Sequence, residues 1–222
     1  MSVPLSRPYA GRDGAPVLDR VDPRIFTLTY FVRCTECSFC HDACCQYGAD
    51  VELTLVREID RHRDDLEAYL GVPREEWFRE DPEDVGYLPE TDYPGGVYTR
   101  TAVVELPAGR SPHSEYGCVF LDPAARGCRL HRFALERGLD FHSVKPMVCV
   151  LFPLSFEHGL LKPAVEFDIN DLVCRGPGGS VYQSTRADVL YYFGAELVAE
   201  LDRLERHHAA AGGRAVPLPV SS

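Results

Sequence analysis

Five cysteines stand within twelve residues of this chain, in the segment Cys34-Thr-Glu-Cys37-Ser-Phe-Cys40-His-Asp-Ala-Cys44-Cys45. The segment contains two overlapping CxxC steps followed by CxxxCC. Two thiolates separated by two residues close readily on one metal ion, because the turn between them directs backbone amides toward the sulfurs. Free cysteines are normally scattered and buried one by one, so this density predicts metal ligation rather than structural thiols.

The adjacent pair Cys44 and Cys45 leaves three arrangements open. Neighbouring side chains in extended backbone point to opposite sides, so both thiols join one site only where the backbone is tightly turned. Alternatively, the two thiols serve different metal centres, or one of them is a redox-active or structural thiol.

A second, dispersed group of cysteines follows at Cys118, Cys128, Cys149 and Cys174. Asp122-Pro123 and Gly127 favour turns, and they predict a connection that brings Cys118 and Cys128 together. The total of nine cysteines is odd, which fits poorly with complete disulfide pairing. Metal ligation or redox chemistry in a reducing compartment is therefore expected.

Other side chains near the cysteines have a chemical or mechanical interpretation. His131 follows Cys128 at a CxxH spacing, and His131, His41 or Asp42 is an alternative source of a non-thiolate ligand. Pro146 and Pro153 flank Cys149, and proline bars helix continuation, so an extended backbone is expected around this cysteine.

The charge of the chain disfavours two classes of partner. Its formal net charge is -11, from 34 acidic and 23 basic residues, and such a field repels phosphate backbones and anionic lipid surfaces. The best apolar run, residues 147–154, is far shorter than the roughly 20 residues that span a bilayer. The first twenty residues do not resemble a secretory signal. We therefore expect a cytoplasmic protein that binds neither nucleic acid nor membranes.

Hydrophobic patterning predicts an α+β fold in a single compact domain over residues 23–208, with short strands and two longer helices around a cysteine-ligated metal centre. Residues 1–22 are expected to be an irregular arm, and residues 209–222 a flexible tail. The expected strands are residues 25–32, 97–106 and a hairpin at 154–165 with its turn at His158-Gly159. Residues 75–96 are expected to be a loop.

Three helices are expected. Apolar residues recur at near-helical spacing over residues 54–70, where Gly71 and Pro73 supply a stop. A short helix spans 129–137 and ends at Gly138. The last helix covers 185–208, where Thr185 and Asp188 resemble a capping box ahead of an apolar stripe.

The order of five cysteine-bearing stretches resembles one known family. These stretches are Cys40 to Cys45, Cys118-Val-Phe-Leu, Gly127-Cys128-Arg-Leu-His131, Lys145-Pro146-Met-Val-Cys149-Val-Leu-Phe152-Pro153-Leu154, and Cys174. Their order and spacing are similar to those of the YkgJ-type cysteine-cluster family, a zinc- or iron-chelating group of proteins. The likeness runs from about residue 30 to residue 205.

The resemblance implies a ligand set of Cys40, Cys44, Cys45, Cys118, Cys128, Cys149 and Cys174. Either Cys34 or Cys37 would complete eight, because the family pattern has fewer cysteines before the adjacent pair than this chain has. We take Cys34 as the eighth ligand and Cys37 as the spare.

The expected cofactor is an iron–sulfur cluster as first choice, or zinc. Both accept four cysteines, but zinc knuckles more often use two matched CxxC pairs, which the dispersed group lacks. The expected function is metal binding with a role in electron transfer, redox sensing or metal handling. Two alternatives remain: a cluster-dependent enzyme, redox-active or similar to a protein lysine methylase, and a zinc-stapled interaction scaffold.

Overall fold

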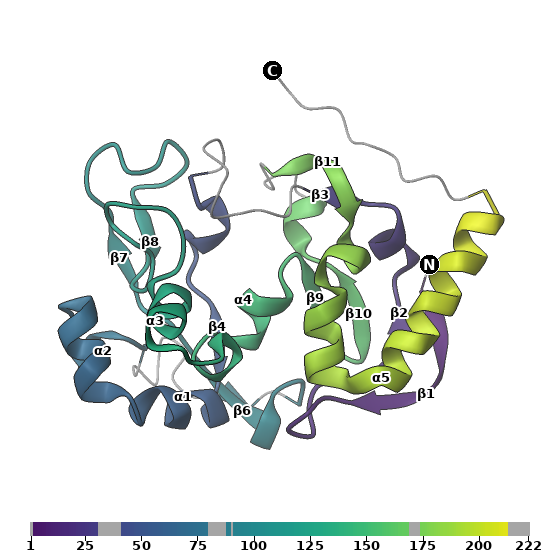
Figure 1. Cartoon of the computed structure of the whole chain (residues 1–222), viewed down its shortest axis with the longest axis horizontal. Helices are drawn as coiled ribbons and strands as arrows, with labels where there is room; N and C mark the ends of the chain where they lie inside the picture. The colour runs from purple at the N-terminus through teal and green to yellow at the C-terminus, as the bar shows by residue number, and fades with distance from the viewer. Residues whose placement is uncertain (1, 31–40, 80–87, 90, 169–173, 213–222) are drawn as a thin grey trace. The chain divides into compact units, whose positions relative to one another are not determined.

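The computed structural model describes residues 2–30, 41–79, 88–89, 91–168 and 174–212. The chain has an α+β fold, as the sequence predicted (Figure 1). It divides into two compact units, each assembled from distant parts of the chain. Unit 1 comprises Met1–Arg33, Thr91–Gly95 and Leu151–Ser222, and unit 2 comprises Cys34–Glu90 and Gly96–Val150. The single domain expected over residues 23–208 stays a prediction.

Unit 1 contains a four-stranded sheet in the order β1-β2-β10-β9. Its strands are β1 (Val3–Ala10), β2 (Val17–Val21), β9 (Leu154–Glu157) and β10 (Leu160–Pro163). The pairs β1–β2 and β9–β10 are antiparallel, whereas β2 and β10 run parallel, with Leu160 opposite Arg20. The predicted hairpin at 154–165 is thereby confirmed, including its turn at His158-Gly159.

The expectation of an irregular arm over residues 1–22 was wrong. Residues 3–10 and 17–21 form β1 and β2, with Leu5, Tyr9 and Leu18 buried, and the pairing of the two strands is irregular between Pro4 and Tyr9. Pro4 and Pro8 obscured the pattern, but proline is tolerated in an edge strand, which is the position of β1. The distant Glu200 also stabilises β1, because its carboxylate accepts hydrogen bonds from Ser6 N at 2.7 Å and Tyr9 Oη at 2.5 Å.

The last helix, α5 (Val181–Ala210), begins before the predicted residue 185. Its N-cap is Ser180, whose hydroxyl accepts a hydrogen bond from Gln183 N at 3.1 Å. The predicted capping box at Thr185 was wrong, because the Thr185 hydroxyl lies inside the helix and donates to Val181 O at 2.8 Å. Gly194 interrupts the helix with φ 80° and ψ 175°, a conformation essentially restricted to glycine.

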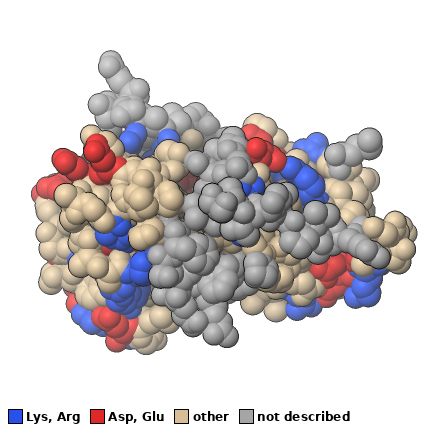
Figure 2. All heavy atoms as spheres, turned by 90° about the horizontal axis from the view of Figure 1, so that it is seen from above, with Lys and Arg blue, Asp and Glu red and all other residues tan. Residues whose placement is uncertain are grey.

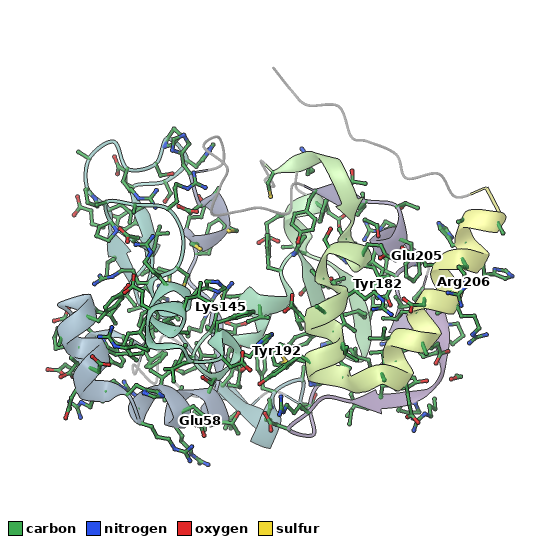
Figure 3. All side chains as sticks on the ribbon, viewed as in Figure 1. Glu58, Lys145, Tyr182, Tyr192, Glu205 and Arg206 are labelled. Carbon is green, nitrogen blue, oxygen red and sulfur yellow. The ribbon has the colours of Figure 1, made fainter. Side chains whose placement is uncertain are left out.

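Side chains on the two sides of the Gly194 break connect the two halves of α5. Tyr182, labelled in Figure 3, donates a hydrogen bond to Asp202 Oδ1 at 2.6 Å. Arg186 forms two further hydrogen bonds to the Asp202 carboxylate, at 2.9 and 2.7 Å. These bonds hold two helical segments together as a hairpin.

Because of these bonds to Asp202, we expect the stability of unit 1 to fall at acidic pH. Hydrogen bonds from Arg186 and then from Tyr182 lower the pKa of Asp202 from 3.8 to about 2. The unfolded chain therefore binds the extra proton between these two values, so the contribution of Asp202 is full above about pH 4 and is lost as the pH falls toward 2. After allowance for solvent screening, we expect a loss of about 1–2 kcal/mol. Urea unfolding across this range measures it, and Asp202→Asn should flatten the pH dependence.

Two smaller pieces complete unit 1. The 3-10 helix η1 (Pro23–Phe26) leads into β3 (Thr29–Tyr30), which pairs antiparallel with β11 (Arg175–Ser180). A 3-10 helix, η6 (Val165–Phe167), follows β10. The strand predicted over 25–32 is therefore shorter than expected, because Asp22 caps η1 and Ile25 and Phe26 enter the core from a helical turn. Residues 31 and 32 lie outside the described part.

Unit 2 is built from short strands and helices. The strands β4 (Asp50–Glu52), β6 (Val97–Arg100) and β5 (Leu88–Pro89) form a sheet in that order, and β7 (Val103–Glu105) pairs with β8 (Tyr116–Cys118). Its helices are α1 (Leu53–Asp60), α2 (Arg63–Leu70) and α3 (Arg129–Arg137). The helix α4 (Met147–Leu151) and the 3-10 helices η2 (Ala43–Cys45), η3 (Arg74–Glu76), η4 (Pro94–Gly96) and η5 (Phe141–Ser143) complete the chain.

The observed elements of unit 2 differ from the predicted ones mainly where a helix or a strand is interrupted. Helix α3 has the predicted bounds and ends at Gly138, which has φ 66°. The helix expected over 54–70 is two helices, because His62 leaves the helical region with φ -107° and ψ 16°. The strand expected over 97–106 is interrupted at Thr101 and Ala102. Of the loop expected over 75–96, residues 80–87 and 90 lie outside the described part.

The core of unit 2 is aromatic and includes cysteines. Trp77 and Phe120 are fully buried and meet edge to face, with ring centroids 5.9 Å apart. Cys118 belongs to this core, and Cys45 and Cys128 pack against it. The core thus places cysteines from three separate segments on one hydrophobic cluster.

Two remaining predictions concern the end of the chain and membranes. Helix α5 continues through Ala210, into the expected tail, and residues 213–222 lie outside the described part. None of the helices in the described ranges has both the length and the apolar character needed to cross a bilayer.

Candidate metal centre

The adjacent cysteines Cys44 and Cys45 lie in a tight turn, the 3-10 helix η2. Asp42, at the start of the turn, has the left-handed conformation with φ 58°, and its carbonyl accepts a hydrogen bond from Cys45 N at 2.8 Å. The two sulfurs are 3.9 Å apart. Cys44 is exposed and Cys45 is half-buried. The backbone condition for sharing one site is therefore met.

Cys118 and Cys128 are joined by the turn that the sequence predicted. Asp122 N donates to Gly127 O at 3.1 Å, and Leu121 and Cys128 form an isolated antiparallel bridge. Cys118 ends strand β8 in a buried position, and its thiol donates to the Thr101 hydroxyl at 3.3 Å. Cys128 is the N-cap residue of helix α3.

Cys149 lies in helix α4, so the extended backbone expected around it was wrong. Proline is tolerated in the first turn of a helix, where its missing N–H has no partner to lose, and the Pro146 carbonyl accepts a hydrogen bond from Cys149 N at 2.9 Å. The buried Glu52 stabilises this helix start, because its carboxylate accepts from Met147 N at 3.2 Å. The second flanking proline, Pro153, follows the end of α4.

Five cysteines of unit 2 lie close enough for their charges to interact, and we call them the thiol group: Cys44, Cys45, Cys118, Cys128 and Cys149. The hydrogen bond from Cys44 favours the Cys45 thiolate, but burial and repulsion by the charges of Cys149, Cys118 and Cys128 raise the Cys45 pKa above its usual value. Burial, and after it repulsion by Cys128, Cys118 and Cys44, likewise raises the pKa of Cys149. Four separate segments thus contribute thiols to one region.

Burial is the main reason that the thiols in this region resist ionisation. It raises the pKa of Cys118 to about 12, and it places the pKa of Cys149 well above the ordinary value. The nearby ammonium of Lys145, labelled in Figure 3, opposes the shift of Cys149. Without a cation these thiols are protonated near neutrality, and a metal that binds them must displace protons.

The described residues do not form a closed ligand set. Within the described ranges, no three Cys, His, Asp or Glu side chains are arranged so that they could hold a metal ion. The expected ligands Cys34 and Cys40, and the expected spare Cys37, lie outside these ranges. Cys174 is buried in unit 1. The structure therefore gathers five of the eight expected ligands into one region of unit 2, without closing a tetrahedral site among them.

A buried ion network lies beside the adjacent pair. Asp42 is 6% exposed, and its carboxylate pairs with Arg110 at 2.8 Å and with Arg126 at 3.1 Å. The same carboxylate accepts a hydrogen bond from Gly127 N at 3.3 Å. Asp42 was one expected source of a non-thiolate ligand, but its carboxylate is bound to these three groups. Neither arginine was predicted as a site residue, since neither lies next to a cysteine in the chain.

The two histidines considered as ligands differ in their surroundings. His131 packs against Phe141 with tilted rings whose centroids are 4.6 Å apart, and burial, followed by the charges of Lys145 and His142, lowers the pKa of His131 to about 4. Its Nδ1 atom is buried and has no hydrogen-bond partner among the described residues. His41 borders a shallow hollow of about 350 Å³, whose other lining residues are Pro107, Ala108, Gly109, Arg110, Pro123, Ala124, Ala125 and Arg126.

Comparison with known proteins leaves the chain without an assigned relative: it matches no protein-family model, no curated protein and no solved structure. The resemblance to the YkgJ-type family therefore continues to depend on the cysteine-bearing stretches alone.

Proposed function

We propose that this chain is a metal-binding protein of the YkgJ type, whose thiol group holds an iron–sulfur centre or zinc together with Cys34 or Cys40. One observation carries the proposal. Five thiols from four separate segments lie close enough for their charges to interact, and Cys45, Cys118 and Cys128 lie in or against one aromatic core. Burial and mutual repulsion nevertheless raise the pKa of Cys45, Cys118 and Cys149 above that of an ordinary cysteine. A cation reverses that cost, because it stabilises the thiolates that repel one another without it.

The spacing of the adjacent pair bears on the kind of metal. In a tetrahedral zinc site with Zn–S bonds of about 2.3 Å, two sulfurs are about 3.8 Å apart. The 3.9 Å between the sulfurs of Cys44 and Cys45 matches this separation. A cluster of four irons takes one thiolate per iron, whereas a cluster of two irons takes two thiolates per iron. The pair therefore suits zinc or one iron of a two-iron cluster.

The proposed role is structural or electron-transferring. A centre closed by four thiolates has no open position for a substrate, which favours these roles over catalysis at the metal. Because unit 2 brings its ligands from segments distant in the sequence, a bound metal would stabilise the unit directly.

The choice of partners follows from charge. The net charge of -11 supports a protein that binds neither nucleic acid nor membranes. In Figure 2, the Lys and Arg residues on the described surface facing the viewer lie among Asp and Glu residues and tan residues of other types. The described part of this face therefore shows no broad basic area of the kind that phosphate backbones require.

The proposal is tested by anaerobic purification followed by counting iron, zinc and acid-labile sulfide per chain. An iron–sulfur centre should give equal iron and sulfide and a brown protein that absorbs at about 400 nm. A zinc site should give a colourless protein with stoichiometric zinc and no sulfide. Purified protein with reduced thiols that holds neither metal, even after anaerobic incubation with each, would contradict the proposal.

A further inference from the structure

We infer that Asp42 is a positioning residue for the proposed metal centre: its buried carboxylate holds the turn that carries Cys44 and Cys45 against the loop that precedes Cys128. This inference rests on the proposed function, because it assigns a role at the same site. The inference is supported by the geometry of the Asp42, Arg110 and Arg126 side chains, none of which belongs to the expected set of cysteine ligands.

The Asp42 carboxylate is bound by three hydrogen-bond donors. The two oxygens of Asp42 are divided between partners, with Oδ2 2.8 Å from Arg110 Nη2 and Oδ1 3.1 Å from Arg126 Nη2. Gly127 N, one residue before Cys128, also donates to Oδ2, at 3.3 Å. Two of these three donors belong to residues 126–127, so the carboxylate links the cysteine turn directly to the loop before Cys128.

Arg110 also donates hydrogen bonds to backbone carbonyls of the same loop. Its Nε donates to Asp122 O at 2.9 Å, and its Nη2 donates to Ala125 O at 2.8 Å as well as to Asp42. The Arg110 side chain is only 8% exposed. A planar guanidinium with several fixed donors joins such groups rigidly, so the turn and the loop are held in one relative position.

Charge makes the arrangement suitable for a thiolate centre. The buried Arg110 side chain and the partly exposed Arg126 side chain face one aspartate, so the network carries an excess positive charge close in the chain to Cys44 and Cys128. A metal bound by four thiolates has a net negative charge, which this excess stabilises. Groups that orient metal ligands from outside the ligand set typically contribute a factor of about 10–100 in metal affinity.

Asp42→Asn tests the role with little change in shape. Asparagine adopts the left-handed conformation of residue 42 readily, and its amide retains one acceptor oxygen but loses the charge. Cobalt(II) and zinc titrations of the full-length protein, with a chromophoric competitor, measure the affinity. The absorption of bound cobalt reports how many thiolates it contacts. We expect affinity about 10–100-fold weaker and weaker thiolate-to-cobalt absorption.

The matched control is Asp65→Asn, which also removes an arginine-paired carboxylate from unit 2. Asp65 pairs with Arg137 at 2.9 Å on exposed faces of α2 and α3, and it belongs to no cysteine-bearing segment. This variant should bind cobalt with wild-type affinity and spectrum. A purely structural effect of losing one ion pair would weaken both variants alike.

A second variant covers the case in which Asp42→Asn fails to fold. Arg126→Gln removes one arm of the network at a partly exposed side chain and should lower cobalt affinity in the same direction. If the wild type binds cobalt and a folded Asp42→Asn or Arg126→Gln protein has the same affinity and spectrum, the positioning role is refuted and the metal-binding proposal stands. If the reduced wild type binds no cobalt, the metal-binding proposal itself fails.

Discussion

Replacing Cys45 by serine is expected to abolish binding of the proposed metal and to destabilise unit 2 by several kcal/mol. Cys45 is the member of the adjacent pair that packs against the aromatic core, and its charge interacts with those of three other cysteines. Metal binding and folding are coupled in small thiolate sites, where structural zinc contributes about 10–16 kcal/mol at neutral pH. Elemental analysis of anaerobically purified protein, together with thermal unfolding with and without a chelator, measures both effects.

The control for Cys45→Ser is Val51→Thr, at a fully buried residue of the unit 2 core. Its added hydroxyl should cost about 1–3 kcal/mol without removing a thiol. Metal content should therefore fall in Cys45→Ser and remain stoichiometric in Val51→Thr. Full metal content in Cys45→Ser would show that Cys45 is not a ligand, and equal metal loss in both variants would show that metal loss only follows destabilisation.

Trp77→Ala is expected to lower the free energy of unfolding of unit 2 by about 3–5 kcal/mol. The indole is fully buried, stands edge to face against Phe120, and donates from Nε1 to Val72 O at 2.9 Å. Truncation leaves a cavity in the cluster that also contains Cys118. Urea unfolding in the presence of a chelator isolates this packing effect from metal binding.

Trp77→Phe separates packing from hydrogen bonding at the same position. The phenyl ring keeps an aromatic contact with Phe120 but leaves Val72 O without the indole donor, which should cost about 1–3 kcal/mol. The loss should therefore be smaller than in Trp77→Ala. An alanine variant that loses less than about 1 kcal/mol would contradict the assignment of Trp77 to the centre of this core.

The sequence predicted correctly those helix ends and turns that depend on residues close together in the chain. Helix α3 ends at Gly138, which has the positive φ of a C-terminal glycine, and the β9–β10 hairpin turns at His158-Gly159. At Gly159, a Cβ atom would stand 2.8 Å from the Asp19 carboxylate, so the residue type and the turn agree. These signals lie within a few residues of the features that they specify.

The wrong predictions concern elements that are stabilised by residues distant in the sequence. Nothing near Ser6 in the sequence indicates that Glu200 accepts its hydrogen bonds and stabilises β1. The first turn of α4 is stabilised by Glu52, a residue almost a hundred positions earlier, so the prolines around Cys149 were misinterpreted. Strand and helix propensities record only neighbouring residues, whereas these elements depend on long-range contacts.

In the candidate site too, some residues could be predicted from the sequence and others could not. The cysteines were identified from their density and order, and the Cys118–Cys128 turn from its turn-forming residues. The ion network around Asp42 was not, because Arg110 and Arg126 become neighbours of the cysteine turn only in the folded chain. Residue types that bind metals are visible in a sequence, but the residues that orient them depend on tertiary structure.

Cadmium-113 NMR of the metal-substituted protein tests most directly whether the separate cysteine segments share one centre. Scalar couplings between a cadmium nucleus and cysteine Hβ protons identify the thiolates bound to the same ion. We expect one cadmium resonance coupled to both Cys44 and Cys45 and to at least one of Cys118, Cys128 and Cys149. Cadmium that couples only to cysteines of a single segment, or that places Cys44 and Cys45 on different ions, would contradict a shared centre.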